Sequence, residues 1–430
     1  MIEIDAESLD LADWVRAGDT VFWGHGTSEP LALSTRLMAQ RHAIGRFAVF
    51  LGPTFSDTPS PEHADRVDFR AYCGIGRNQV LDAAGVLDVL PCRISQVPQL
   101  LDAGTLRCDV ALLQLGPDDL AGRPTPGVSH DYLFDAAARA RTVVVERNAH
   151  APRTVGAEDA APLRIDVLVH TARPVLELSD TPATEVELAI ARHVCGLIPD
   201  RAVLQLGIGS VPKAILSGLR GHRDLGLHSG MLGDGIVDLI ERGVITNACK
   251  AIDRGVSITG MLAGTKALYD FADDSAAIRL RPVRYTHDAG VLAQLRNFHA
   301  VNSAIEVDLG GQVNAEVIGG RYVGAVGGQL DFVRAAQASP GGRSIIALPS
   351  KTTDGRRSRI VARLPAAVVT TPRSDADLFV TEWGVADLRG QPLAERMRRV
   401  LAIADPQFRE EIGRAARLAG APHRFPQGME

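Results

Sequence analysis

The sequence predicts an α/β protein with mainly parallel sheets covered by helices, in two domains at residues 1–180 and 181–430. Short runs rich in β-branched residues alternate with amphipathic helical runs along the whole chain, an order typical of parallel sheets. A chain of 430 residues is longer than single hydrophobic cores usually grow, which favours two domains. Residues 171–185, TARPVLELSDTPATE, are rich in Pro, Ser, Thr and Asp and form the expected junction.

Each domain contains short apolar runs that predict buried strands and longer runs with helical periodicity that predict helices. In the first domain, strands are expected at 20–24, 47–52, 109–115 and 142–147, and helices at 29–41, 97–104 and 132–140. In the second domain, strands are expected at 202–207, 256–262, 344–349 and 377–382, and helices at 185–198, 234–243 and 290–298 and as a pair within 392–418. The two domains therefore show a similar order of strands and helices, without an alignable repeat.

The composition limits the kind of partner. With 46% hydrophobic and 23% charged residues, the chain has the make-up of an ordinary globular protein. A net charge of −5 and a pI near 6.2 lack the basic footprint of a nucleic-acid-binding protein, and no polybasic block favours a membrane surface. No apolar run has the length of a membrane span, and the acidic start MIEIDAESLDLADW does not resemble a signal peptide. We therefore expect a cytoplasmic protein with a small-molecule partner.

The cysteines predict neither a disulfide framework nor a metal site. They are odd in number and include no C-x-x-C pair, a pattern that fits reduced thiols in a cytosolic enzyme. Their expected role is that of small buried apolar side chains. They are Cys73, Cys92, Cys108, Cys195 and Cys249.

Parallel sheets bind ligands beyond the carboxyl ends of their strands, so glycine-rich turns between a strand and a helix are the expected places for a site. The first such turn is LQLGIGSVPKAI, where Gly207 and Gly209 allow close backbone approach and the following amides suit a phosphate or a developing oxyanion. Dinucleotide binding is disfavoured, because Pro212 stands in place of the third glycine and Asp224 precedes its strand. A tight turn without a ligand is the alternative.

The second turn is GLHSGMLGDG, residues 226–235. If the chain is extended here, the side chain of His228 faces the same way as position 230, which is a glycine. Ser229 lacks the setting of a nucleophile elbow, so a local backbone hydrogen bond is expected for it. Asp234 stands where a helix begins and is expected to cap it.

The third and fourth turns supply further candidates. In AVGGQLDFVRAA, Gly327 and Gly328 precede a helix and could donate backbone hydrogen bonds, and Asp331 complements the helix dipole. In VTEWGVADLRG, Glu382 ends a strand and either positions a ligand or pairs with Arg389.

Three other polar segments have simpler explanations. Glu306 and Asp308 share a strand face and are either paired catalytic carboxylates or, more simply, a solvated or salt-bridged face. His299 fits a hydrogen-bonded core histidine, and the basic segment 350–359, SKTTDGRRSR, fits a solvated loop.

Taken together and in order, these segments resemble the acetyl-CoA hydrolase/transferase family, which includes 4-hydroxybutyrate and succinyl-CoA:acetate CoA-transferases. The likeness extends over nearly the whole chain. The segments that resemble the first domain of the family are RAGDTVFWGHGTSEP, DVALLQLGPDD and ERNAHAPRTVG. Those that resemble its second domain are LQLGIGSVPKAI, HSGMLGDGIVDLIERGVITN, NSAIEVDLGGQVNAE, VGGQLDFVRAA, GGRSIIALPS, SRIVARL and VTEWGVADLRGQPL.

The resemblance implies two tandem CoA-transferase-type α/β domains, a ligand between them and a homodimer. It implies coenzyme A as part of the substrate, with no permanently bound cofactor and no metal. In the family a glutamate attacks the acyl-CoA thioester and then forms a glutamyl-CoA intermediate. That glutamate belongs to an H-[ST]-E-M element, which here is His228, Ser229, Gly230 and Met231. Position 230 therefore has no side chain that could be acylated.

The same resemblance assigns the remaining site residues. The backbone amides of Gly207, Ile208 and Gly209 and of Gly327 and Gly328 are expected to hold the thioester oxygen and the coenzyme A arm. Asn302 and Glu382 match positions that contact the substrate or orient the nucleophile. The segment LGPDD, residues 115–119, departs from the serine and two prolines of relatives.

Three functions remain open on the sequence. The first is a water-dependent acyl-CoA enzyme, in which water enters the space left at Gly230 and His228 serves as the base, cleaving a thioester or the carbon–carbon bond of a β-keto or cyclic acyl-CoA. The second is a CoA-transferase that uses another carboxylate or a ternary route. The third is an acyl-CoA-binding protein without catalysis.

Overall fold

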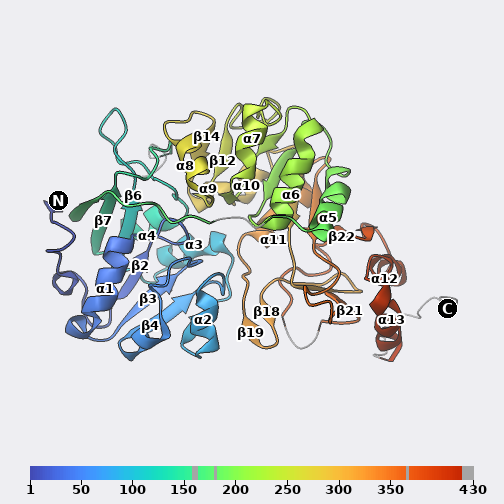
Figure 1. Ribbon diagram of the computed structural model, residues 1–430, viewed down its shortest axis with the longest axis horizontal. Coiled ribbons are helices and arrows are strands. Elements are labelled where there is room, and N and C mark those ends of the chain that lie inside the picture. The colour runs from blue at the N-terminus through green and yellow to red at the C-terminus, as the bar shows by residue number, and fades with distance from the viewer. Residues whose placement is uncertain (157–162, 179–181, 365–367, 419–430) are drawn as a thin grey trace.

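The structure, a computed structural model, describes residues 1–156, 163–178, 182–364 and 368–418. Two mainly parallel sheets with helices on their faces lie side by side, so the predicted fold class is confirmed (Figure 1). Elements of the first half occupy the left of Figure 1, and α12 and α13 lie at the opposite end. The predicted domain boundary, between residues 180 and 181, lies outside the described residues and stays a prediction.

The first sheet has eight parallel strands in the order β1-β8-β7-β6-β2-β3-β4-β5. Both faces of this sheet are buried: Val21 and Trp23 of β2 pack in one core and Phe22 packs in the other. This is why its strands read as continuous apolar runs in the sequence. The strands are β1 (Ile2–Glu3), β2 (Thr20–Trp23), β3 (Phe47–Leu51), β4 (Val67–Ala71), β5 (Leu87–Val89), β6 (Val110–Leu115), β7 (Thr142–Asn148) and β8 (Val167–Thr171).

All four strands expected in the first half are confirmed, and β1, β4, β5 and β8 are additions. The three expected helices are also present, and α2 is added. Leu33 and Leu37 of α1 pack on one face of the sheet, while α3 and α4 pack on the other. The helices are α1 (Leu31–Ile44), α2 (Asn78–Ala83), α3 (Val97–Asp102) and α4 (Leu133–Arg139).

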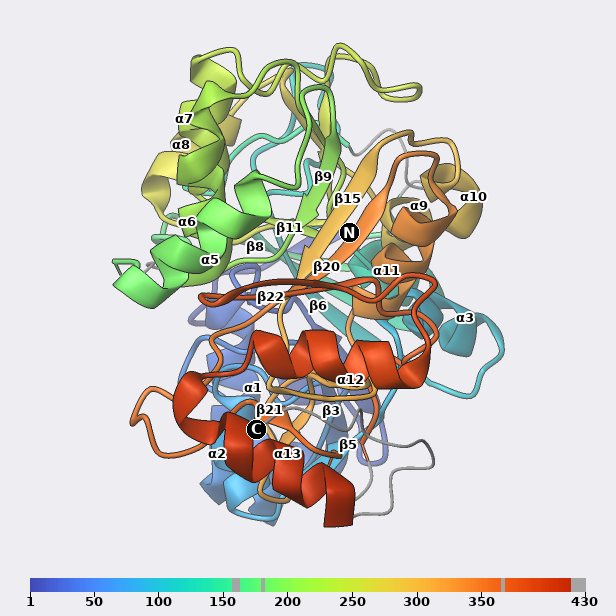
Figure 2. The ribbon, with the colours of Figure 1, turned by 90° about the vertical axis from the view of Figure 1, so that its right-hand side faces the viewer.

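The second sheet has the order β10-β9-β15-β20-β22-β23, and only its edge strand β23 is antiparallel. Its strands are β9 (Val203–Leu206), β10 (Gly226–Leu227), β15 (Phe298–Asn302), β20 (Arg343–Ala347), β22 (Leu378–Thr381) and β23 (Gly384–Asp387). On one face lie α5 (Glu185–Cys195), α6 (Ser210–Gly218), α7 (Gly235–Glu241) and α8 (Lys266–Ala272), and on the other lie α11 (Gln329–Ala338), α12 (Leu393–Ala402) and α13 (Arg409–Leu418) (Figure 2). The Thr184 hydroxyl and the Glu187 carboxylate form a capping box that starts α5.

Two predicted elements of the second half are wrong in extent. The single strand expected at 256–262 is divided by Gly260 into β12 (Ser257–Thr259) and β13 (Met261–Leu262), which belong to separate two-stranded sheets. A glycine inside a strand weakens it and allows the chain to change partners.

The helix expected at 290–298 is only α10 (Ala289–Leu292), and β15 begins at Phe298. Asn297 has a φ of 52°, a left-handed conformation that an α-helix cannot contain. The short helix α9 (Val283–Thr286) and a set of small strands complete the second half. The small strands are β11 (Met231–Leu232), β14 (Ile278–Leu280), β16 (Glu306–Asp308), β17 (Val313–Asn314), β18 (Val317–Ile318), β19 (Arg321–Tyr322) and β21 (Ile360–Val361).

Backbone hydrogen bonds join the two halves where their sheets end. The amide of Ile94 donates to the carbonyl of Gly327 at 3.0 Å, and the amide of His130 donates to that of Gly260 at 3.0 Å. The amide of Val283, the first residue of α9, donates to the carbonyl of Asp131 at 3.0 Å. The carboxyl ends of strands from both sheets are thereby held against a common space.

A buried ion pair stabilises the first half. Glu146 of β7 is fully buried, and its carboxylate accepts from the Arg173 guanidinium and from the Thr171 hydroxyl. The same guanidinium donates to the carbonyl of Glu29 at 2.8 Å. Removing the arginine would leave a buried carboxylate without its counter-charge.

We expect Arg173→Met to lower the free energy of unfolding by about 3 to 5 kcal/mol. The substitution removes the positive charge and leaves the Glu146 carboxylate buried without a partner, so the free energy of its desolvation is no longer offset. Urea unfolding followed by tryptophan fluorescence measures the loss. Arg220→Met is the matched control, since its pair with Asp238 is half-exposed and is expected to contribute less than about 1 kcal/mol. Equal effects of the two substitutions would contradict the prediction.

Candidate functional site

A cavity of about 320 Å³ lies where the two sheets end. His25, Pro53 and Tyr72 follow β2, β3 and β4 of the first sheet and line one side. The other side is formed at the ends of β9, β10 and β15 of the second sheet. Ligands of parallel α/β proteins bind at such strand ends, and the volume suits a small molecule or the acyl end of a larger one.

The structure brings most of the predicted site residues into the wall of this cavity. They are Gly207, Ile208, Gly230, Asn302, Gly327 and Gly328. The side-chain Nδ2 of Asn302 donates to Oε1 of Gln205 at 3.2 Å, which links the ends of β15 and β9. Gly209 does not line the cavity; it is the N-cap residue of α6, with a φ of 109° that glycine adopts without strain. The roles assigned to these residues stay predictions.

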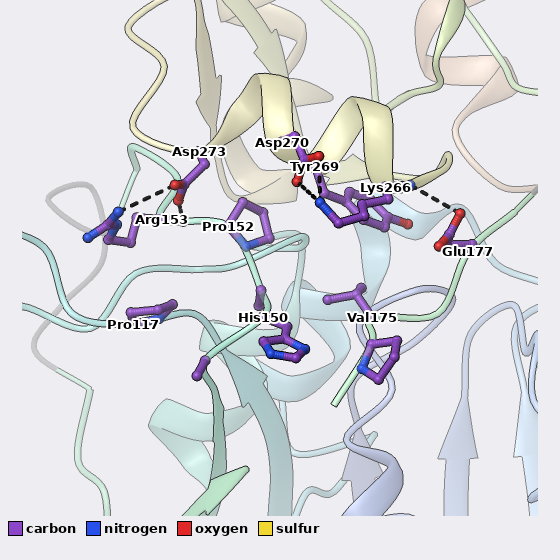
Figure 3. A pocket seen from close by; sticks show the side chains of 13 residues that line it. Pro117, His150, Pro152, Arg153, Val175, Glu177, Lys266, Tyr269, Asp270 and Asp273 are labelled. Carbon is purple, nitrogen blue, oxygen red and sulfur yellow. Dashed lines mark hydrogen bonds and ion pairs between the residues drawn. The ribbon is translucent and has the colours of Figure 1, made fainter. Parts of the chain in front are cut away.

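A larger cavity of about 820 Å³ lies between loops of the first half and α8 (Figure 3). Of its charged side chains, Lys266 pairs with Asp270 and Arg153 with Asp273, while Glu177 accepts from the backbone amide of Lys266. Pro117, from the segment that departs from the family pattern, lines it. Because its lining includes none of the predicted catalytic or binding residues, we take the smaller cavity as the candidate site.

The imidazole of His287 fills the space beside Gly230. A methyl group on Gly230 would lie 2.9 Å from Cε1 and 3.1 Å from Nε2 of His287. A methyl group on Gly328 would be closer still to Nε2. The ring also packs on Phe332, with 4.5 Å between ring centroids. The expectation that the missing side chain leaves open space is therefore wrong directly beside Gly230, because an imidazole occupies that volume.

Hydrogen bonds and nearby charges define the state of His287. Its Nδ1 lies 2.8 Å from the Thr286 hydroxyl, which is also 3.5 Å from the carbonyl of Pro282. Burial lowers the pKa of His287 below the usual 6.5, while the carboxylates of Asp131 and Asp331 oppose that shift. The neutral ring is therefore favoured near pH 7.

His228 has a different environment from the one expected of a base. Its side chain is fully buried and is absent from the cavity wall. Its Nε2 donates to the backbone carbonyl of Thr286 at 3.0 Å, and its ring stacks on Tyr285. Burial, with Lys250 nearby, lowers the pKa of His228 to about 3. The arrangement favours an anchoring role, in which His228 holds the residue that precedes His287.

Glu382 is also placed away from the cavity. Its carboxylate accepts from the amide of Ser350 at 2.9 Å and from the Ser350 hydroxyl, so the expected alternative of a pair with Arg389 is wrong. Arg389 pairs instead with Asp387. The residue that Glu382 orients is thus a serine of the loop after β20.

Other polar residues have structural partners. The hydroxyl of Ser229 donates across to the carbonyl of Leu206 at 2.8 Å, a longer-range bond than expected. Asp234 is at the N-cap of α7, but its carboxylate accepts from the Thr265 amide at 2.9 Å and does not cap the helix. Asp331, in the first turn of α11, pairs with Arg93 across the two halves.

Asp308 accepts from the side chain of Gln312, whereas Arg359 is the charged neighbour of Glu306. His299 is buried at the start of β15, and its Nδ1 lies 2.9 Å from the carbonyl of Asn297. None of these three predicted candidates lines the cavity.

The cavity is also lined by three residues that no sequence motif had pointed to, His25, Asp131 and His287. Nε2 of His25 lies 3.2 Å from a carboxylate oxygen of Asp131, and both side chains are buried. His25 directly follows a predicted strand, so the rule that ligands bind at strand ends could have found it. Asp131 and His287 follow no strand and have no comparable sequence signal.

Comparison with known proteins assigns the family. Residues 5–167 match the acetyl-CoA hydrolase/transferase N-terminal domain, and residues 264–416 match the C-terminal domain of the same family. The chain is 41% identical to the 4-hydroxybutyrate coenzyme A transferase of Clostridium kluyveri over 330 residues, covering 76% of this chain and 77% of that one. The protein belongs to the acetyl-CoA hydrolase/transferase family.

Two solved structures show the same fold. RipA from Yersinia pestis superimposes with a TM-score of 0.91 and 33% identity, covering 97% of both chains. The 4-hydroxybutyrate CoA-transferase from Porphyromonas gingivalis superimposes with a TM-score of 0.81 and 31% identity, covering 97% of this chain and 98% of that one. In the two relatives named as transferases, coenzyme A is part of the substrate.

We expect Gly230→Ala to lower the free energy of unfolding by about 1 to 3 kcal/mol, because the added methyl group overlaps the His287 ring and forces it to move. Urea unfolding measures the change. Gly221→Ala is the matched control, since a methyl group there would meet no atom within 4 Å. Equal free energies of unfolding for the two variants would contradict this prediction, because they would mean that the His287 ring moves aside without loss of stability.

Proposed function

We propose that the protein hydrolyses acyl-CoA compounds, with water as the acceptor, in the cavity that Gly230 lines. The reaction releases a carboxylic acid and coenzyme A. When the acyl group carries a β-carbonyl, attack of water at that carbonyl would instead cleave a carbon–carbon bond and leave a shorter acyl-CoA.

One observation supports hydrolysis over transfer. Among the described residues, Asp131 is the one carboxylate in the cavity wall, and it is paired with His25. The family mechanism needs a carboxylate nucleophile, and position 230, where the resemblance places it, is a glycine. Glu306 and Glu382 do not line the cavity.

The backbone around the cavity supports a reaction in which charge develops on an oxygen. Gly207 and Ile208 lead into α6, and Gly327 and Gly328 lead into α11. Amides at helix starts favour negative charge, and a single donor to an oxyanion typically contributes about 3 to 4 kcal/mol to the transition state. We assign the thioester oxygen to these amides.

Transfer of CoA between carboxylates is the second candidate, because named relatives are CoA-transferases and Asp131 could take the place of the missing glutamate. It predicts that CoA exchange depends on an added carboxylate acceptor. Binding of acyl-CoA without turnover is the third candidate, and calorimetry with no product formed would support it.

We expect the purified protein to convert at least one of acetyl-, succinyl-, 4-hydroxybutyryl- and acetoacetyl-CoA to products without an added acceptor, since water takes that role. Liquid chromatography with mass spectrometry detects the free acid and coenzyme A. Addition of acetate is expected to leave the rate unchanged. Intact substrates throughout, or a strict requirement for acetate, would count against hydrolysis.

The mass of the intact protein during turnover distinguishes the two reactions. Hydrolysis by water predicts no covalent adduct, because no side chain is acylated. A glutamyl- or aspartyl-CoA adduct, mapped by peptide analysis to Asp131 or any other acid, would support transfer and overturn the proposed function.

We also propose a homodimer in the cytoplasm. The family resemblance supports the dimer, and an odd number of cysteines without a C-x-x-C pair fits the reduced thiols of a cytosolic enzyme. In the described ranges, no helix has the length and hydropathy to cross a bilayer. Light scattering should give about twice the 45.8 kDa mass of one chain.

A further inference from the structure

We infer that His287 is the catalytic base of this site and that its Nε2 accepts a proton from the attacking water, in the place where relatives hold a carboxylate. The inference rests on the proposed hydrolysis and names the residue that replaces the missing group. It assigns the base to a segment outside every motif of the family resemblance.

The position of the ring is the first argument. Nε2 lies beside two glycines that line the cavity, Gly230 and Gly328, and a side chain on either would displace it. The family resemblance places the nucleophilic carboxylate on residue 230. The imidazole therefore adjoins the backbone position to which the resemblance assigns the nucleophilic glutamate.

The hydrogen bonds of the ring are the second argument. Nδ1 of His287 lies 2.8 Å from the Thr286 hydroxyl, and the other neighbour of that hydroxyl, the carbonyl of Pro282 at 3.5 Å, can only accept. When the hydroxyl directs its proton to that carbonyl, it accepts from Nδ1–H of His287. This leaves the lone pair of the neutral ring on Nε2, which is the atom next to the glycines. The tautomer is thus the one that a base at this position needs.

The anchoring of the segment is the third argument. His228 donates to the carbonyl of Thr286, and the amide of Val283 donates to the carbonyl of Asp131. Both ends of α9 are therefore tied down, one to the second sheet and one to the first half of the chain. A base has to be held within hydrogen-bond distance of its water, and these bonds fix the backbone that carries it.

The charged and titratable groups that face His287 come from three surrounding elements. Asp131 lies on the loop before α4, Asp331 on α11, and His228 at the end of β10. The two carboxylates stabilise the imidazolium that forms when the ring takes a proton. Burial disfavours that charge, so the ring is neutral before the reaction and available to accept.

The proposed step balances without a further reagent. As the water oxygen bonds to the thioester carbon, the carbonyl electron pair moves to the oxygen and Nε2 takes a water proton. The tetrahedral intermediate then re-forms its carbonyl and breaks the carbon–sulfur bond. The leaving thiolate takes the proton from Nε2, and the products are a carboxylic acid and the thiol of coenzyme A.

His287→Ala tests the assignment with the acyl-CoA of the panel that the native protein hydrolyses fastest. We expect kcat to fall by about 10²- to 10⁴-fold with little change in KM, because the base acts in the transition state and does not bind the substrate. Free imidazole added to this variant should restore part of kcat, since the substitution leaves a space of that shape between Gly230 and Gly328.

His299→Gln is the matched control, because it also removes a buried imidazole but lies outside the cavity wall. It is expected to retain the native kcat. Circular dichroism shows whether each variant is folded, and calorimetry shows whether it still binds the same acyl-CoA. If His287→Ala does not fold, His287→Asn, which keeps a polar side chain of similar reach, is measured in its place.

The pH dependence provides a second readout. A base must be unprotonated, so kcat of the native protein should fall as the pH drops through the pKa of His287, with a midpoint below 6.5 because burial lowers that pKa. The His287→Ala variant should lack this fall of kcat at low pH, which we call the acid limb. A merely structural role of His287 would change kcat without removing the limb.

The outcomes separate the two proposals. If folded His287→Ala hydrolyses the substrate with the kcat of the native protein, and this kcat still falls at low pH, the inference is overturned and the proposed function remains. Absence of hydrolysis by the native protein would overturn both. Loss of kcat, rescue by imidazole and loss of the acid limb together support the inference.

Discussion

The site depends on a steric exclusion: the volume beside residue 230 holds either a side chain from that residue or the imidazole of His287. A methyl group at position 230 would already be 2.9 Å from the ring, and one at position 328 would be closer. Protein interiors are close-packed, so two groups cannot share that space. A side chain at position 230 therefore requires the His287 ring to move, so the glycine and the position of the imidazole depend on each other.

The surrounding structure fixes the ring in this position. Thr286 bonds to the ring through its hydroxyl and to His228 through its carbonyl, so both the segment after β10 and the short helix α9 hold this residue. Asp131 contributes in two ways, since its carbonyl receives the first amide of α9 and its carboxylate faces the ring. Much of this framework comes from the first half of the chain, although the ring belongs to the second.

The same scaffold can thus support two kinds of chemistry. Strand ends and helix starts supply amides around the cavity whether the acceptor is a carboxylate or water, because those amides depend on backbone geometry and not on the nucleophile. Under the proposed function, the imidazole of another segment takes the place of one carboxylate, and water replaces that carboxylate as the group that attacks the substrate. Membership of the family therefore determines the framework of the site more firmly than its reaction.

The α/β class, nearly all of the strands and helices that were expected, and the glycine turns that line the cavity could be predicted from the sequence, because periodicity and turn chemistry are local properties. It misjudged residues 256–262 and 290–298, where Gly260 and the left-handed Asn297 redirect the chain. The packing of distant segments places His287 and Asp131 in the cavity wall and leaves His228 and Glu382 outside it. Contacts between segments far apart in the chain depend on how the two sheets dock, and no local pattern encodes that docking.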